Sequence, residues 1–96
     1  GEEFCVALPR TALPTAAKVA ERIRKAVQKT EFLSADGRKI AVTVSLGVAQ
    51  LAPSDANYTS LIERADAALY QAKRSGRNRV ITTPAEPVTN APSNLL

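Results

Sequence analysis

The stretch ADAALYQAKRSGRN, residues 65–78, decides the fold of this 96-residue chain. Together with the residues just before it, it repeats apolar side chains at helical spacing, which predicts an amphipathic helix. The apolar face comprises Leu61, Ile62, Ala65, Ala68, Leu69 and Ala72. Gly76 is expected to end the helix, because glycine readily adopts the left-handed conformation of a C-terminal cap. Asn57 or Thr59 is the expected N-cap.

Strands are predicted on both sides of this helix. Residues 40–49 alternate larger apolar residues with smaller ones over ten positions, which indicates the longest strand in the chain. Residues 32–33 lead into it through an Asp-Gly turn signal at 36–37, so these segments predict a hairpin. Gly47 indicates a bulge or a close backbone approach. Residues 80–81 predict a last short strand.

The first part of the chain predicts one more strand and one more helix. The apolar run Phe4–Leu8 is stopped by Pro9, which is typical of a strand buried on both faces. A helix then begins near Pro14. Its apolar positions are Ala16, Val19, Ala20, Ile23, Ala26 and Val27.

The order of these elements, β-α-β-β-α-β, predicts an α+β domain with helices packed on a mainly antiparallel sheet. We assign this domain to residues 1–81. Residues 82–96 are rich in Pro, Thr, Asn, Ser and Ala without periodicity, and they predict a disordered tail. The chain contains no methionine, so we expect it to be a fragment or a processed product.

Composition argues against several classes of function. The formal net charge is +4, but the basic residues are spread along two helices with few aromatic residues between them, which argues against nucleic-acid binding. The absence of histidine argues against a zinc site or a serine-histidine triad. A single cysteine, Cys5, suits a reducing compartment. No apolar stretch is long enough to span a membrane, so we expect a cytoplasmic protein without membrane contact.

Two groups of charged residues could carry chemistry. Glu2 and Glu3 follow Gly1 directly before the first predicted strand, and carboxylates at such a turn suit Mg²⁺ or Mn²⁺. The alternative is a solvated chain terminus. Lys73 and Arg77 are four residues apart, so they could converge on a polyanion. The alternative is that they only complement the helix dipole.

Three segments together resemble one known family. Gly1-Glu2-Glu3-Phe4 is similar to the last four positions of a GG(D/E)EF motif, and residues 42–49, VTVSLGVA, resemble the strand that follows it in that family. Residues 65–78 resemble the block A-D-x-A-L-Y-x-A-K-x-x-G-R-N. In this order and spacing, residues 1–81 resemble the C-terminal part of the GGDEF domain of diguanylate cyclases.

The resemblance implies an enzyme of bacterial second-messenger signalling. In this family two GTP-loaded domains face each other as a homodimer. Each 3′-hydroxyl attacks the α-phosphate of the other GTP, and the products are cyclic di-GMP and pyrophosphate. Carried over by position, Glu2 would ligate Mg²⁺ or Mn²⁺ and assist deprotonation, and Glu3 would be the second acid of the site. Gly1 would let the backbone approach the nucleotide, while Lys73 and Arg77 would clamp the terminal phosphates.

Arg22 matches a position that some family members use to bind product at an inhibitory contact. The alternative is an ordinary solvated arginine on the polar face of its helix. Asp66 and Asn78 belong to the matched block, and we interpret them as a helix-surface group and a turn-forming group without a catalytic role.

The sequence lacks the first glycine of the motif and the N-terminal half of the domain, which in the family supplies another metal-binding aspartate and the guanine-recognising residues. We therefore expect the isolated chain to be inactive. Two alternatives remain open at this point. One is a non-catalytic GGDEF-like module that binds GTP or cyclic di-GMP. The other is an interaction fragment without a ligand, which would self-associate through an exposed edge of the Phe4–Leu8 strand.

Overall fold

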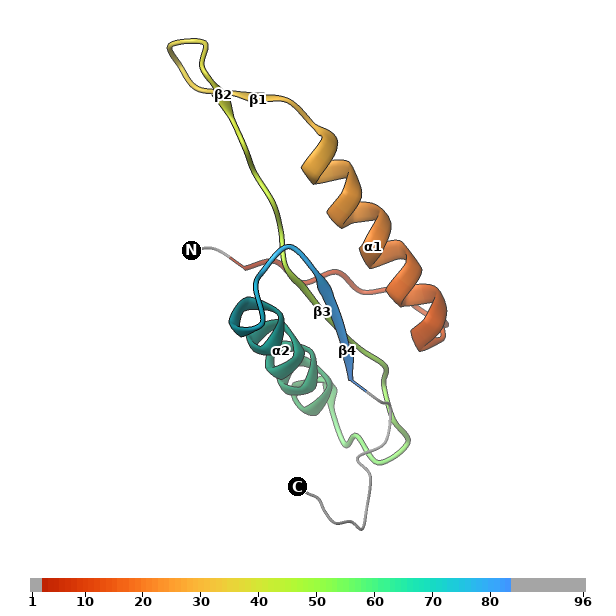
Figure 1. Ribbon diagram of the computed structural model, residues 1–96. Helices are drawn as coiled ribbons and strands as arrows, with labels where there is room; N and C mark the ends of the chain where they lie inside the picture. Colours follow the sequence, from red (N-terminus) through yellow and green to blue (C-terminus); the bar gives the residue numbers. More distant parts are fainter. Residues whose placement is uncertain (1–2, 84–96) are drawn as a thin grey trace.

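The computed structural model describes residues 3–83 of the chain. Figure 1 shows two long helices flanking a short pair of strands, with a small hairpin projecting beyond them. The elements, in chain order, are α1 (Leu13–Lys29), β1 (Phe32–Leu33), β2 (Lys39–Ile40), β3 (Leu46–Ala49), α2 (Tyr58–Arg74) and β4 (Val80–Thr83). Both helices pack against β3 and β4. The predicted α+β class is therefore confirmed.

Helix α2 begins and ends where its sequence predicts. The side-chain oxygen of Asn57 accepts a hydrogen bond from the Thr59 backbone N–H at 3.0 Å, which satisfies one of the free donors at the helix start. The helix ends at Arg74, and Gly76 follows with φ +131°, a conformation that residues with a side chain rarely adopt. Asn57 is thus the N-cap and Gly76 lies in the terminating turn.

Helix α1 confirms the predicted amphipathic segment. Pro14 lies in its first turn, where a missing N–H costs no helical hydrogen bond. The backbone N–H of Leu13 donates to the side-chain oxygen of Gln50 at 3.2 Å, and this bond connects the start of α1 to the end of β3. Ala16 and Ala20 are the buried residues of the helix, so its contact with the strands is made by small side chains.

The sheet differs from the prediction. β3 and β4 pair in parallel, with Leu46 opposite Val80 and Ala49 opposite Thr83. The expectation of a mainly antiparallel sheet is wrong, because α2 carries the chain back to the end where β3 began, and a strand that follows such a crossover runs parallel to its neighbour. β1 and β2 form a separate antiparallel hairpin around the predicted Asp-Gly turn.

Two predicted strands are shorter or absent. The strand predicted at 40–49 is interrupted. Ile40 ends β2, residues 41–45 are not strand, and β3 covers the remaining residues. Phe4–Leu8 forms no strand either. Phe4 is 89% exposed and Val6 is 68% exposed, so the predicted burial on both faces is wrong. The apolar pattern favours a strand at both places, but a strand also needs a neighbour for its backbone groups, and no described segment pairs with these residues.

β4 continues to Thr83, two residues beyond the domain boundary that we predicted. Residues 84–96 lie outside the described residues, as do Gly1 and Glu2. The predicted boundary after residue 81 is therefore too early by two residues. The disordered tail stays a prediction for residues 84–96.

The core of the described part is small and built from alanines. Its buried apolar residues are Ala16, Ala20, Ala52, Ala68 and Ala72. At Gly47, β3 and α2 pack backbone against backbone, without a large side chain between them. A Cβ atom on Gly47 of β3 would meet the backbone of Ala65 and Leu69 in α2, so Gly47 marks the close backbone approach that its position in the strand predicted.

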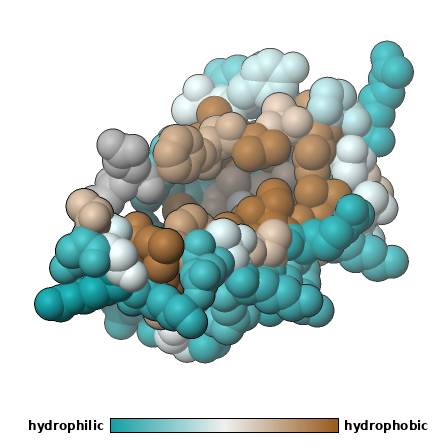
Figure 2. Space-filling view, turned by 90° about the horizontal axis from the view of Figure 1, so that it is seen from above, coloured by the Kyte–Doolittle hydropathy of each residue, from teal (hydrophilic) through white to brown (hydrophobic). Residues whose placement is uncertain are grey.

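Larger apolar side chains line an open groove instead of filling a core. Figure 2 shows apolar residues gathered around a hollow on one face of the molecule. The groove is bordered by residues 3–12, by one face of α1, by β3 and by α2.

Neither described helix is both long enough and apolar enough to cross a membrane.

Candidate functional site

Glu3 and Lys73 meet at one end of the groove. The Nζ atom of Lys73 lies 3.3 Å from Oε2 of Glu3, and this ion pair joins two residues that are 70 positions apart. Both side chains remain partly exposed to solvent. The pair brings the start of the chain to the C-terminal end of α2. Glu3 of the predicted motif therefore lies beside Lys73 of the predicted phosphate clamp.

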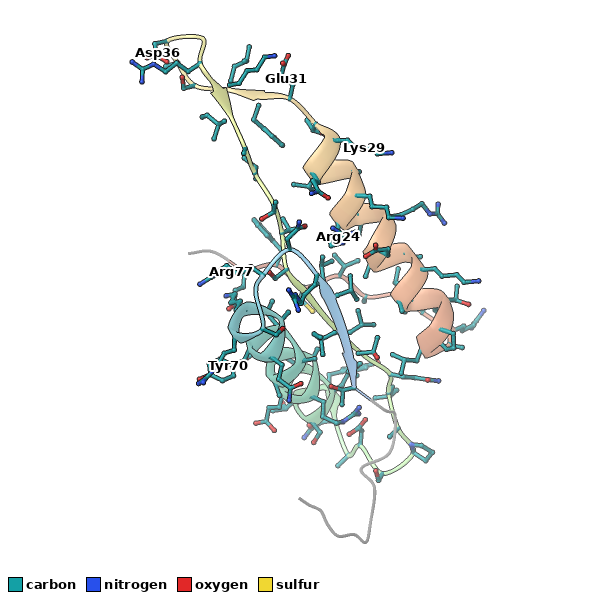
Figure 3. The ribbon with its side chains drawn as sticks, viewed as in Figure 1. Arg24, Lys29, Glu31, Asp36, Tyr70 and Arg77 are labelled. Atoms are coloured by element: carbon teal, nitrogen blue, oxygen red, sulfur yellow. The ribbon has the colours of Figure 1, made fainter. Side chains whose placement is uncertain are left out.

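Arg77 lies in the turn that follows α2, at the corner that leads to β4 (Figure 3). Its backbone N–H donates to the carbonyl oxygen of Ala72 at 2.9 Å. Arg77 and Asn78 both adopt left-handed backbone conformations, with φ of 62° and 50°. Arg77 borders the same groove as Glu3 and Lys73. We call this region, residues 73–79, the basic corner.

The basic corner has the electrostatic character of an anion site. It contains Lys73, Arg74, Arg77 and Arg79, four cations within seven positions. Within residues 3–83, the guanidinium of Arg77 forms no ion pair, so its donors remain available to a ligand. Arg74 is engaged elsewhere, since its Nη1 donates to the Tyr70 hydroxyl at 3.0 Å and its guanidinium lies 5.6 Å from the Tyr70 ring centre. Of these four cations, Lys73 and Arg77 are the two that border the groove.

The metal part of the site is only partly described. Glu2, the predicted metal ligand, and Gly1 lie outside the described residues. Among residues 3–83 there is no group of three or more acidic, cysteine or histidine side chains arranged to hold a metal ion. Glu3 offers the hard oxygen donors that Mg²⁺ prefers, but its carboxylate is paired with Lys73. The described residues alone therefore do not fit a divalent metal.

Arg22 is not part of this site. It lies exposed on α1 and does not border the groove. The neighbouring Glu21 is paired with Arg24 and Lys25 instead. The structure leaves the predicted role of Arg22 in product binding open.

The structure reveals connections to the basic corner that sequence reasoning missed. Nη1 of Arg24 on α1 donates to the side-chain oxygen of Asn78 at 3.0 Å. The backbone N–H of Asn78 donates to the Ser45 hydroxyl oxygen at 3.1 Å. Asn78 is thus the turn-forming residue that we predicted. No local signal could have found its partners, because they are 54 and 33 positions away in the chain.

The Arg24 guanidinium also changes the titration of its neighbour. Nε and Nη2 of Arg24 bind the two carboxylate oxygens of Glu21 at 2.8 and 2.6 Å. This charge-assisted hydrogen bonding is the main reason that the pKa of Glu21 lies below its ordinary value, and the charge of Lys25 adds to it. The same bonding raises the pKa of Arg24. Both side chains are therefore ionised at neutral pH.

Comparison with known proteins identifies the family of the chain. Residues 1–79 match the family described as diguanylate cyclase, GGDEF domain. The chain is 49% identical over 80 residues to diguanylate cyclase A of Treponema denticola and 48% identical over 82 residues to the response regulator PleD of Caulobacter vibrioides. These matches cover 83% and 84% of the chain but only 21% and 18% of the relatives.

A solved structure has the same fold. The GGDEF domain of DgcB from Caulobacter crescentus, crystallised in complex with c-di-GMP, superposes with a TM-score of 0.73 at 40% sequence identity. The match covers 78% of the chain and 44% of the DgcB domain. The chain thus spans about a fifth of the curated relatives that it matches and less than half of this solved domain. On the family match and these identities, the chain belongs to the GGDEF domain family.

Proposed function

We propose that this chain is the part of a diguanylate cyclase domain that carries the catalytic turn and the phosphate clamp. The parent activity would be the condensation of two GTP molecules into cyclic di-GMP and pyrophosphate. One observation supports this most directly. The 3.3 Å contact between Glu3 and Lys73 unites the GG(D/E)EF-like turn with the basic corner, so an acid and a cation suited to phosphoryl transfer lie at one place.

In this proposal each described residue has a distinct task. Lys73 and Arg77 bind the terminal phosphates of GTP and stabilise the charge that develops on departing pyrophosphate. Glu3 keeps Lys73 oriented toward the motif and is the second acid of the site. The left-handed turn at Arg77 directs the chain so that its side chain borders the groove together with Lys73.

Gly1 and Glu2 complete the proposed turn. Gly1 allows the backbone to approach the nucleotide, because it has no side chain. Glu2 would ligate Mg²⁺ or Mn²⁺, a cation that would supply positive charge beside the phosphates, and its carboxylate would assist removal of the proton from the attacking 3′-hydroxyl. We propose a cytoplasmic enzyme in which two such domains act as a homodimer, because each GTP attacks the α-phosphate of the other.

The proposal is tested by grafting. Residues 1–79, which match the family, would replace the corresponding segment of the Treponema denticola diguanylate cyclase A, and the chimera would be incubated with GTP and Mg²⁺. We expect cyclic di-GMP synthesis, and we expect Lys73→Ala to reduce the rate ~100-fold, the effect of removing one donor that stabilises transition-state charge. Lys18→Ala is the matched control, since Lys18 is exposed on α1 and does not border the groove. A folded chimera without synthesis would overturn the proposal.

A second candidate is a non-catalytic module that binds GTP or cyclic di-GMP. It is favoured by one observation, that the basic corner forms without an acidic metal cluster among residues 3–83. The chimera distinguishes the two functions, because a binding module would hold GTP without converting it.

A further inference from the structure

Arg24 connects α1 to the basic corner. Its side chain is only 15% exposed, although it lies on a helix whose other cations point into solvent. One edge of the guanidinium binds the carboxylate of Glu21, and Nη1 donates both to Asn78 at 3.0 Å and to the side-chain oxygen of Gln28 at 3.2 Å. Figure 3 shows Arg24 on α1 and Arg77 at the turn beyond α2.

The turn that Arg24 contacts is one that needs support. Arg77 and Asn78 are consecutive residues with side chains in the left-handed region, which L-residues other than glycine visit only with steric strain. Asparagine tolerates this conformation better than most residues, but arginine has no such preference. The conformation therefore persists because surrounding groups hold it.

Three hydrogen bonds from other parts of the fold hold the turn, in addition to the local one from Nε of Arg79 to the Arg77 carbonyl oxygen at 3.1 Å. The Arg77 N–H is bound by the carbonyl oxygen of Ala72 in α2. The Asn78 N–H is bound by Ser45, which lies just before β3. The Asn78 side chain is bound by Arg24 from α1. The first two bonds hold the backbone alone, whereas the third attaches the side chain of Asn78 to a different layer of the fold.

From this geometry we infer that Arg24 is a positioning residue for Arg77. Through Asn78 it holds the left-handed turn in the conformation that presents the Arg77 guanidinium to the phosphates of the substrate. This inference rests on the proposed function of Arg77. Arg24 itself does not touch the ligand, because it does not border the groove.

The chemistry of the network requires an arginine at this position. The planar guanidinium offers donors along two edges, so it binds Glu21 with one edge and Asn78 with the other. Glu21 fixes the plane of the guanidinium and neutralises its charge. Lysine offers one ammonium group and could not hold both partners in this geometry.

The test measures binding of inorganic pyrophosphate to the 96-residue chain, without divalent metal. Affinity would be followed by NMR through the backbone amide signals of residues 73–79. We expect Arg24→Met to weaken binding roughly 3- to 10-fold, the effect of losing one hydrogen bond. Asn78→Ala should weaken it at least as much, because it also removes the side chain that tolerates the left-handed conformation. The double variant should bind no worse than Asn78→Ala alone, because both changes remove the same contact.

Three controls separate positioning from other effects. Lys18→Met removes the same charge from an exposed site on the same helix and should change affinity by less than about 2-fold, since a solvated distant charge is screened. Asp55→Asn weakens an ion pair on the far side of the fold and should lower thermal stability without changing pyrophosphate affinity. Arg77→Ala removes the proposed ligand-binding group and should reduce binding most.

Each outcome has one meaning. If the wild-type chain does not bind pyrophosphate, or if Arg77→Ala binds as well as wild type, the proposed function of the corner fails and the inference fails with it. If Arg77→Ala loses binding but Arg24→Met behaves like Lys18→Met, the proposed function stands and the positioning role of Arg24 is overturned. Additive effects of Arg24→Met and Asn78→Ala would also overturn it.

Discussion

The backbone of Gly47 in β3 lies directly against the backbone of Leu69 in α2, with no room for a side chain between them. This contact sets the distance between the helix and the strand pair. It also keeps the C-terminal end of α2 close to Ser45, which lies just before β3 and binds the backbone N–H of Asn78.

Gly47→Ala should destabilise the fold strongly. The added methyl group would meet the backbone atoms of Ala65 and Leu69, which cannot move aside without separating α2 from β3. We expect a loss of about 1–3 kcal/mol or more, the range for overpacking a close contact, measured by urea unfolding. Gly37→Ala is the comparison, because its Cβ would meet nothing within 4 Å and only its positive φ is strained. Equal stability of Gly47→Ala and wild type would contradict the close approach.

Asn57→Ala should weaken α2 at its first turn. The Thr59 N–H would lose its side-chain acceptor, and such N-cap replacements cost about 1 kcal/mol. The melting temperature should fall by about 4–8 °C for a domain of this size. Asn57→Asp keeps the acceptor oxygen and adds a charge that suits the helix N-terminus, so it should melt near wild type. A larger fall for Asp than for Ala would argue against the cap.

Asp55 should matter more than exposed acids. Its side chain is 6% exposed, pairs with Arg64 and accepts a hydrogen bond from the Ala52 N–H at 2.7 Å. Asp55→Ala removes a partly buried, charge-assisted hydrogen bond to Arg64, which should cost about 1.5–3 kcal/mol. Glu31→Gln, which removes an exposed pair with Lys39, should leave stability nearly unchanged. Urea unfolding would compare the stabilities of the two variants. Equal losses would show that the Asp55–Arg64 pair is no better protected from water than the Glu31–Lys39 pair.

Stability should fall in acid partly through Glu21. Its pKa in the folded chain lies below the ordinary value of 4.5 because Arg24 binds the ionised carboxylate. The folded state therefore binds fewer protons than the unfolded state, and the stabilisation is present above the ordinary pKa and lost as pH falls through the lowered one. Unfolding of Glu21→Gln between pH 6 and pH 3 should show a shallower loss than wild type. The pKa of Asp36 is also lowered, mainly by its hydrogen bond with Ser34. Asp36→Asn should therefore also make the loss of stability in acid shallower, and it is measured in the same way. Parallel curves for wild type and Glu21→Gln would refute the role of Glu21.

The isolated 96-residue chain should synthesise no cyclic di-GMP. The chain matches less than half of the solved DgcB domain, and we propose that binding of metal-bound GTP needs the rest of the domain. Incubation with GTP and Mg²⁺ followed by nucleotide chromatography would check this. The active chimera described above is the positive control, and product from the chain alone would disprove the prediction.

The helices and their ends could be predicted because their determinants are local. Helix α2 follows from apolar residues three and four apart, from a cap at Asn57 and from a turn at Gly76. Each of these features acts within one or two helical turns. The same reasoning found the hairpin around residues 36–37, because its Asp-Gly turn joins neighbouring segments.

The strands could not be predicted equally well. Phe4–Leu8 and residues 41–45 have the composition of strands, but they do not pair as strands with any described segment. The parallel pairing of β3 with β4 was not predicted either. The alternation of side chains along a strand indicates which face is apolar, but it does not indicate which other strand pairs with it or in which direction.

The candidate site divides in the same way. The sequence alone determined the residue types and the motifs around them from which we predict that Glu3, Lys73 and Arg77 take part in phosphate chemistry. Only the tertiary structure decided that Glu3 meets Lys73 across 70 positions and that Arg24 supports the turn at Asn78 across 54. The physical reason is that side-chain spacing acts over a few residues, whereas these contacts depend on how α1, α2 and the strands pack together.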